Sequence, residues 1–446
     1  MRKTGQIHNA FDATDASRRT FLQLSAAAGA SLMAGLPFSR ADAQGKINLT
    51  YMSSELTSAT VGPEIRRQLA EFEKANPRVT VEAIPSPMAQ YPTKVVAAAK
   101  AGEMPDIVFL EIWWIQNWIK EGYMQDLTPF VERAGGKAFL GRFYDNLIQL
   151  ASRDGKVYAL PIFAAGWCLY YNTEMFKEAG LDPDKPPTNW EEFLAYAKKL
   201  TKKDAAGNTI QWGYGIHGQN LGSDTSRFIQ WMVGNGAQPL SSDYKRALLD
   251  QPKAIEALRF WSELYTKHGV VPPGSIQNGP GEVRSLFAQK KIAMQMGILW
   301  GLDQVFAENP AMRSITRIAP FPKQVANAPS ILAPGFNGIA RTSKHAAEAF
   351  KVLEYWSRPE NGLALYKATR YGPVQPSVFA RPEVKNDPYL QVQAKINENL
   401  QSLPLIPQWE RASRIIGDAM QRALTGAKTP EAAFKEANAQ VNQVLQ

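Results

Sequence analysis

Near its beginning the chain alternates strand-like and helix-like stretches, and this alternation limits its fold more than any other feature. Residues 47–51, 79–83 and 105–110 have the apolar patterns of strands. A helix from Pro63 to Asn76 and another over residues 95–100 separate them. Strands joined by crossover helices form a parallel or mixed sheet. The sequence therefore predicts a chain that begins as an α/β unit.

Further elements follow in the middle of the chain. Asp154-Gly155 is a tight-turn pair and predicts a β-hairpin between residues 147–151 and 157–162. Thr188 and Glu191 have the spacing of a capping box, which predicts the start of a helix.

The last third of the chain has a similar pattern. Residues 291–296, 317–322 and 331–340 resemble strands, and a helix is expected around Ala349 to Trp356.

Length, charge and cysteine content exclude several classes of protein. About 400 residues follow the first 43, and ordinary domain sizes predict that a chain of this length forms two lobes. The formal net charge of +9 comes from scattered Lys and Arg pairs without a basic run, so nucleic acid is not an expected partner. Cys168 is the one cysteine, and it is expected to be a small buried residue.

The first 43 residues have the pattern of an export signal. Ser17-Arg-Arg-Thr-Phe-Leu22 is typical of a twin-arginine signal, and a short apolar region and Ala41-Asp-Ala43 follow it. Cleavage is expected before Gln44. No cysteine is placed for a lipid anchor, so a free periplasmic protein is expected.

Several weak motifs occur in a characteristic order: residues 101–108, 155–161, 169–176, 186–193, 287–294 and 424–434. In that order the chain resembles the family 1 extracellular solute-binding proteins of bacterial ABC importers, which include the maltose- and glycerol-phosphate-binding proteins. The resemblance extends over nearly all of residues 45–446.

The resemblance implies a two-lobed periplasmic binding protein fold of type II. Each lobe is a mixed sheet flanked by helices, with the ligand cleft at the hinge. Hinge crossings are expected near residues 110, 320 and 370. Residues 44–110 and 322–370 would form the first lobe, and residues 111–321 and 371–446 the second. The expected protein is a monomer without a cofactor or metal, and its partner is an ABC permease of the inner membrane.

Ligands of such folds bind beyond the carboxyl ends of strands, in the cleft between lobes. Ser53 and Ser54 follow the first strand, where their hydroxyls could contact a ligand or cap the loop. Glu111 follows the third strand, at a position where the glycerol-phosphate-binding relatives also carry Glu. It could accept hydrogen bonds from sugar hydroxyls or favour a helix start.

Aromatic side chains are the second signal, because sugars stack their C–H faces on rings. The sequence has 11 tryptophans, and Trp190, Trp261 and Trp356 are expected in the core. The resemblance points to four aromatic candidates for the cleft: Trp113, Trp167, Trp231 and Trp300. Phe163 is a further candidate, because it follows a predicted strand and is expected with Trp167 on the second lobe's side of the cleft.

Two further segments complete the candidate ligand site. Phe336 and Asn337 lie in a Gly-rich stretch that could bring backbone amides to a ligand or form a plain bulge. Arg370 and Tyr371 lie near the third crossing and could cover the closed cleft. An Arg there would also suit a phosphate or carboxylate.

An enzyme is the main rival class. His217, His268 and His345 are far apart after the leader, and no nucleophile elbow, P-loop or dinucleotide motif occurs. A carbohydrate-active enzyme with two carboxylates remains an alternative, but no such pair is singled out. The expected ligand is a mono- or oligosaccharide. The alternative is glycerol-3-phosphate or a related polyol phosphate, and few clustered carboxylates argue against a polyamine.

Overall fold

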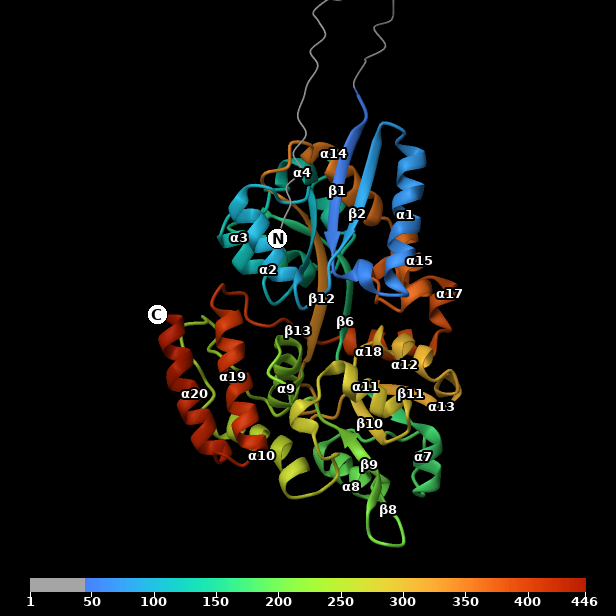
Figure 1. The fold of residues 1–446 in the computed structure, drawn as a ribbon, viewed down its shortest axis with the longest axis vertical. Coiled ribbons are helices and arrows are strands. Elements are labelled where there is room, and N and C mark those ends of the chain that lie inside the picture. Colours follow the sequence, from blue (N-terminus) through green and yellow to red (C-terminus); the bar gives the residue numbers. More distant parts are fainter. Residues whose placement is uncertain (1–44) are drawn as a thin grey trace, which may run out of the picture. The chain divides into compact units, whose positions relative to one another are not determined.

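The computed structural model describes residues 45–446, which form two large β-sheets flanked by helices (Figure 1) and one small two-stranded sheet. The first sheet has the order β13-β12-β3-β1-β2, with β6 also paired to β12. The second has the order β11-β7-β10-β9-β8. Each contains both parallel and antiparallel pairs. The predicted α/β class with two mixed sheets is therefore confirmed.

The first sheet begins with the predicted α/β unit. Its strands and the helices between them are β1 (Ile47–Ser53), α1 (Val61–Ala75), β2 (Val79–Pro85), α2 (Tyr91–Ala101) and β3 (Ile107–Glu111). Strands β1, β2 and β3 are parallel, as helical crossovers require. Gly102 ends α2 in the left-handed region, with φ of 75°.

Short elements join β3 to the next strand of the same sheet. They are α3 (Ile115–Lys120), α4 (Thr128–Arg133), α5 (Lys137–Leu140), α6 (Asp145–Leu150), β4 (Ser152–Arg153), β5 (Lys156–Val157) and β6 (Ala159–Gly166). The Asp154-Gly155 turn does form a hairpin, but its arms are β4 and β5. Residues 147–150 are helical, so the longer first arm expected from the sequence is wrong.

The second sheet contains β7 (Cys168–Asn172), β8 (Lys202–Lys203), β9 (Thr209–Gly215), β10 (Ile292–Gly297) and β11 (Thr316–Pro320). Its helices are α7 (Thr173–Glu178), α8 (Trp190–Leu200), α9 (Gly222–Gly234), α10 (Pro252–Thr266), α11 (Pro280–Ala288), α12 (Gly301–Glu308) and α13 (Met312–Ile315). Helix α8 is capped by Asn189, which accepts from the Glu192 amide, so the capping residue lies one position after Thr188.

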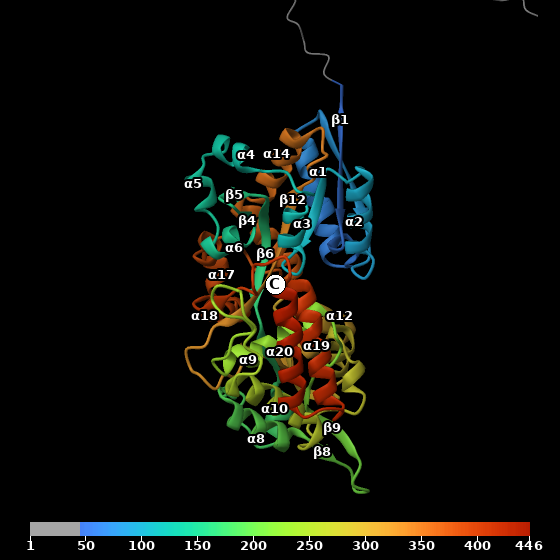
Figure 2. The same ribbon diagram turned by 90° about the vertical axis from the view of Figure 1, so that its left-hand side faces the viewer.

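The remaining elements are β12 (Ser330–Ile339), β13 (Leu400–Gln401), α14 (Ala346–Trp356), α15 (Pro359–Thr369), α16 (Pro376–Phe379), α17 (Pro382–Lys385), α18 (Pro388–Asn397), α19 (Trp409–Leu424) and α20 (Pro430–Leu445). Two short 3₁₀ helices lie at Glu55–Thr57 and Ser275–Gln277. Helices α19 and α20 pack on each other and on α10, as Figure 2 shows.

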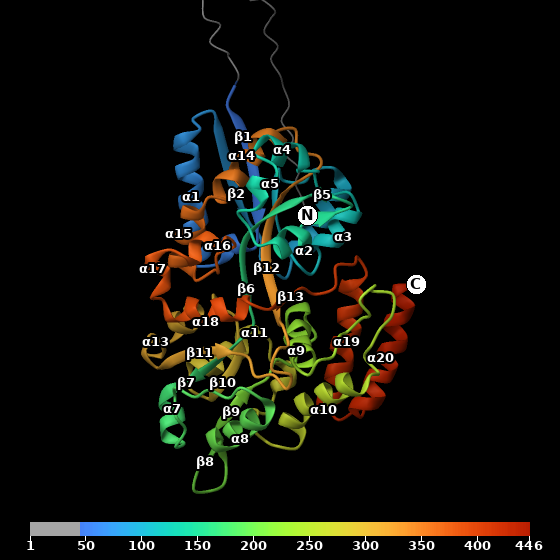
Figure 3. The ribbon, with the colours of Figure 1, turned by 180° about the vertical axis from the view of Figure 1, so that it is seen from behind.

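The chain passes between the sheets at Trp167. Strand β6 pairs with β12 in the first sheet, and β7 pairs with β10 in the second (Figure 3). Residues between β3 and β6 stay with the first sheet: Met124 bridges Ala340, and the Phe130 and Phe350 rings stack at 5.4 Å. This first passage differs from the one expected near residue 110. A second passage joins β11 to β12.

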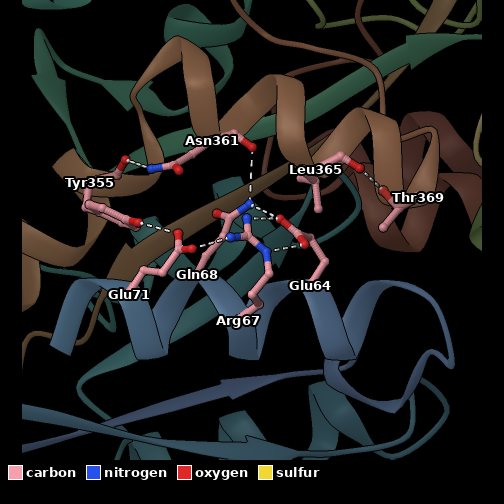
Figure 4. A network of polar contacts seen from close by, with 8 residues as sticks. All are labelled: Glu64, Arg67, Gln68, Glu71, Tyr355, Asn361, Leu365 and Thr369. Atoms are coloured by element: carbon pink, nitrogen blue, oxygen red, sulfur yellow. Dashed lines mark hydrogen bonds and ion pairs between the residues drawn. The ribbon is translucent and has the colours of Figure 1, made fainter. Parts of the chain in front are cut away.

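Helix α1 is held to α14 and α15 by a polar network (Figure 4). Gln68 Nε2 donates to Glu64 Oε1 at 2.8 Å and to the Asn361 carbonyl at 3.2 Å. The Tyr355 hydroxyl donates to Glu71 Oε2 at 3.2 Å. Gln68 is buried, so its amide group holds α1 against α15.

The expected export signal, residues 1–43, lies outside the described residues. Within residues 45–446, no helix has both the length and the apolar character needed to span a membrane.

Candidate functional site

Glu55 and Glu111 follow two neighbouring parallel strands of the first sheet. Strand β1 ends at Ser53 and β3 ends at Glu111 itself, and these strands pair in parallel. Their carboxyl ends therefore lie at the same edge of the sheet. The charge of Glu55 also raises the pKa of Glu111, after the larger effect of burial.

Glu55 is buried and is bonded to Tyr371. The Tyr371 hydroxyl donates to Glu55 Oε2, and the Glu55 side chain forms no ion pair within residues 45–446. Burial raises the pKa of Glu55 to about 7, although the Tyr371 bond lowers it. At neutral pH this carboxyl group is therefore close to its midpoint of ionisation.

Glu111 has a similar environment. Trp113 Nε1 donates to Glu111 Oε2, and burial raises the pKa of this carboxyl to about 8. The Trp113 ring lies beside α9 of the second sheet, because a Cβ added at Gly222 would be 3.8 Å from it. Trp113 therefore connects the carboxylate edge of the first sheet with the helix layer of the second.

Three aromatic rings meet where the two sheets adjoin. Trp300 and Tyr371 stack with centroids 4.7 Å apart and an interplanar angle of 6°. Phe163 contacts both, at 5.1 Å from Trp300 and 4.0 Å from Tyr371. We call Phe163, Trp300 and Tyr371 the ring cluster. Trp300 remains half-buried, so part of it is accessible to a ligand.

Arg370 is engaged with acidic and aromatic side chains. Its Nε donates to Asp303 Oδ1 at 3.0 Å, and its guanidinium lies 4.8 Å from the Tyr389 ring centroid. Asp303 lies on α12 beside the second sheet, and Arg370 ends α15 with φ of 56°. The ion pair thus joins α12 to the segment that carries Tyr371.

Trp167, between β6 and β7, is buried beside Arg227 of α9. Trp167 Nε1 donates to Ser226 Oγ at 3.1 Å, and the Arg227 guanidinium lies 4.2 Å from the Trp167 ring centroid. Arg227 NH1 is 3.4 Å from Asp224 Oδ1. Asp224 is fully buried, and burial raises its pKa to about 7.

Trp231 is a core residue, which corrects its assignment to the cleft. It is 1% exposed and contacts the rings of Trp190, Phe193, Tyr214, Phe260 and Phe321. These rings enclose Trp231, so it offers no face to a ligand.

Four other candidates have structural partners or are buried. Ser53 Oγ accepts from the Glu55 amide at 3.1 Å, which favours the loop-capping alternative. Asn337 Oδ1 accepts from the Tyr51 hydroxyl at 3.2 Å, and Phe336 is fully buried. Ser54 is also buried.

The Gly-rich stretch is a bulged strand. Phe336 and Asn337 lie inside β12, and the register shifts between Gly335 and Phe336. This is the plain bulge weighed as an alternative. Gly335 is required there, because a Cβ would approach Phe163 to 2.3 Å.

Sequence reasoning missed Glu55, Asp224 and Arg284 as members of this region. Glu55 directly follows the two serines that were singled out, so position after a strand could have indicated it. Asp224 and Arg284 lie on helices, where only the tertiary fold reveals which side chains face the junction. No group of metal-ligating side chains occurs within the described residues.

Comparison with known proteins identifies the class. Residues 58–363 match the family model described as bacterial extracellular solute-binding protein, and the chain belongs to this family. A putative binding protein of Brucella abortus is 27% identical over 421 residues, which cover 93% of this chain and 98% of that protein. The multiple sugar-binding protein of Streptococcus mutans is 24% identical over 331 residues, 70% of this chain and 71% of that one.

Solved structures show the same fold. An ABC transporter solute-binding protein from Thermotoga lettingae, bound with alpha-D-tagatose, superposes with a TM-score of 0.81 and 27% identity. The match covers 90% of this chain and 100% of that chain. The expected two-lobed fold and the predicted family are therefore confirmed.

Proposed function

We propose that this protein is the substrate-binding component of a bacterial ABC importer and captures a sugar between its two lobes. The observation that carries the proposal is the ring cluster, where Trp300 beside the second sheet stacks on Tyr371. Aromatic faces next to carboxylates are the usual combination for binding carbohydrate.

The candidate site supplies both parts of that combination. Trp300 and Trp113 are half-buried rings, and Glu111 is a half-buried acceptor close to Trp113. Carboxylates accept hydrogen bonds from neighbouring hydroxyl groups well. The two other ring-cluster members, Phe163 and Tyr371, would support Trp300, and Trp167 would line the opposite wall beside Arg227.

Glycerol-3-phosphate or a related polyol phosphate is the alternative ligand. It would need Ser53, Ser54 and Arg370, but Ser53 caps its own loop and Arg370 is paired with Asp303. These contacts favour a neutral part of the ligand, such as a stacked sugar ring, over a phosphate group at that position.

The lobes are proposed from the strand pairing. Residues 46–166 and 330–369 would form the first lobe, and residues 168–320 and 409–445 the second, because each set contributes to one sheet or packs on it. Helix α18 contacts β6 and β11 and would belong to the hinge.

The proposed cellular role is the usual one for this family. The exported protein would act in the periplasm as a monomer and deliver its ligand to an inner-membrane permease, without catalysis. A ligand that touches both lobes stabilises their closed arrangement by its differential affinity, and the permease would recognise that arrangement.

A thermal-shift screen tests the proposal. The protein from Gln44 onward is heated with sugars, polyols, polyol phosphates and polyamines. A ligand at a hundred times its dissociation constant adds about 2.7 kcal/mol of stability, which raises the melting temperature. The proposal expects a shift with a sugar class. A shift confined to polyol phosphates or to polyamines would contradict it.

A further inference from the structure

Arg284 is a cation without a polar partner at the junction of the two sheets. It lies on α11 and is half-buried, and within residues 45–446 its guanidinium makes no hydrogen bond or ion pair. A side chain at Gly301 would come within 3.7 Å of Arg284 Cδ and 2.9 Å of the Tyr170 hydroxyl. Arg284 therefore lies beside the first turn of α12, directly after Trp300.

Arg284 belongs to a basic group of residues on the second lobe. Its charge lowers the pKa of Arg227 and of the buried His217, in both cases after the larger effect of burial. Asp224 compensates Arg227 at 3.4 Å. The low pKa keeps His217 neutral. The charges of Glu282 and Glu308 act on Arg284, but neither carboxylate forms an ion pair with its guanidinium within the described residues.

The nearest acids on the same lobe, Glu282 and Glu308, accept hydrogen bonds from other groups and not from Arg284. Glu282 Oε2 accepts from the Gly279 amide at 3.0 Å, where it caps the start of α11. Glu308 Oε1 accepts from the Ser285 hydroxyl at 2.5 Å. A guanidinium that folding removes in part from water without giving it an acceptor costs free energy, and an anionic ligand would offset that cost.

The first-lobe wall has the opposite character. Glu55 and Glu111 are bonded to the neutral donors Tyr371 and Trp113, and neither forms an ion pair within the described residues. Two carboxyl groups in the same cleft disfavour a dianion such as a phosphate ester. The site therefore suits a ligand with a single negative charge on one side and hydroxyl groups on the other.

We propose that the ligand is an acidic sugar, with a carboxylate bound by Arg284 and a ring that stacks on Trp300. The hydroxyl groups of the sugar would donate to Glu55 and Glu111. Arg284 is then the residue that selects acidic sugars over their neutral counterparts. This inference rests on the proposed sugar-binding function.

The test is calorimetric titration with matched pairs of sugars: D-galactose and D-galacturonate, D-glucose and D-glucuronate, maltose and maltobionate. Wild type should bind an acidic member more tightly than its neutral partner. Arg284→Gln should lose about tenfold to a hundredfold in affinity for the acid, and its affinity for the neutral partner should fall much less. Arg317→Gln removes the same charge from an exposed ion pair with Asp184 and is the control.

The outcomes separate this inference from the proposed function. Tighter binding of the neutral members would overturn the acidic sugar but keep a sugar-binding protein. A response confined to added glucose 6-phosphate would overturn the carboxylate assignment. No binding of any sugar would contradict the proposed function and this inference together.

A second measurement needs no ligand. If Arg284 binds a ligand and does not stabilise the fold, Arg284→Gln should leave the melting temperature of the ligand-free protein unchanged or raise it. The substitution removes an unpaired, partly desolvated charge. A clear fall in the melting temperature would show that Arg284 stabilises the folded protein, and would overturn its assignment as a ligand-binding residue.

Discussion

Trp300 and Tyr371 lie face to face, and Phe163 supports both rings from the first sheet. Replacing Trp300 with Ala removes the half-buried ring and should weaken sugar binding by about 1–3 kcal/mol. Calorimetric titration with the sugar found in the thermal screen measures this loss. Trp212→Ala, a half-buried tryptophan on β9, is the control. Equal affinity of Trp300→Ala and wild type would remove Trp300 from the site.

Glu55 predicts a pH dependence of stability. Its pKa is raised from 4.5 to about 7 in the folded protein, so the folded state holds a proton that the unfolded state has lost over this range. The contribution of Glu55 to stability is therefore fully present below pH 4.5 and is lost as the pH rises toward 7.

Glu55→Gln should remove that loss. Between pH 5 and pH 7.5 the free energy of unfolding of the variant should fall by about 1–3 kcal/mol less than that of wild type. Urea denaturation at several pH values measures the difference, with the exposed Glu103→Gln as the control. Parallel pH profiles for wild type and Glu55→Gln would contradict the assigned environment.

The candidate residues show what sequence can and cannot predict at this scale. Trp300 lies three residues after the end of β10, so its place near the junction could be inferred from position. Trp231 lies in the last turn of α9, and its burial depends on rings from α8, β9, α10 and residue 321, which no local pattern reveals. Asp303, the partner of Arg370, lies 67 residues away, so this ion pair could not be predicted from the sequence either.

At the scale of elements, the contact between α1 and α15 depends on one buried amide. Gln68→Ala would leave the Asn361 carbonyl and Glu64 without this donor and should lower the free energy of unfolding by about 1–2 kcal/mol. Urea denaturation measures it. Glu71→Ala removes a more exposed acceptor of the same network and should cost less (Figure 4). Equal losses would mean that the buried amide has no special role.

Regular elements were predictable because their signals are local. The strands at residues 107–111, 292–297 and 330–339 and the helix at residues 346–356 lie within a few residues of the predicted ones. Errors occurred at boundaries. Residues 147–150 are apolar enough for a strand, yet they form the end of α6, because a short apolar run fits either structure.

For the whole molecule, the Arg370–Asp303 ion pair is expected to favour contact between the lobes. Asp303→Asn should shift the ligand-free protein toward an open arrangement, because the pair joins α12 to the end of α15. Small-angle X-ray scattering should then show a larger radius of gyration without sugar than for wild type.

The control for that measurement is Arg381→Gln, which breaks the ion pair between Arg381 and Glu360 of α15. It should leave the radius of gyration unchanged. An unchanged radius in Asp303→Asn as well would show that the ion pair does not hold the lobes.

The two-sheet organisation could be predicted from motif order and length, but the first passage between sheets could not. Residues 112–158 contain no long strand, and their attachment to the first sheet depends on contacts such as Gln125 N–H to the Ile339 carbonyl at 2.8 Å. Those contacts join segments more than 200 residues apart, and local periodicity carries no information about them.

The most direct test of the account is a crystal structure of the protein with the sugar that most raises its melting temperature. We expect the sugar to lie between the lobes, to stack on Trp300 and to donate a hydrogen bond to Glu111. A sugar bound elsewhere, or bound in the cleft without contact to either residue, would contradict the proposed site.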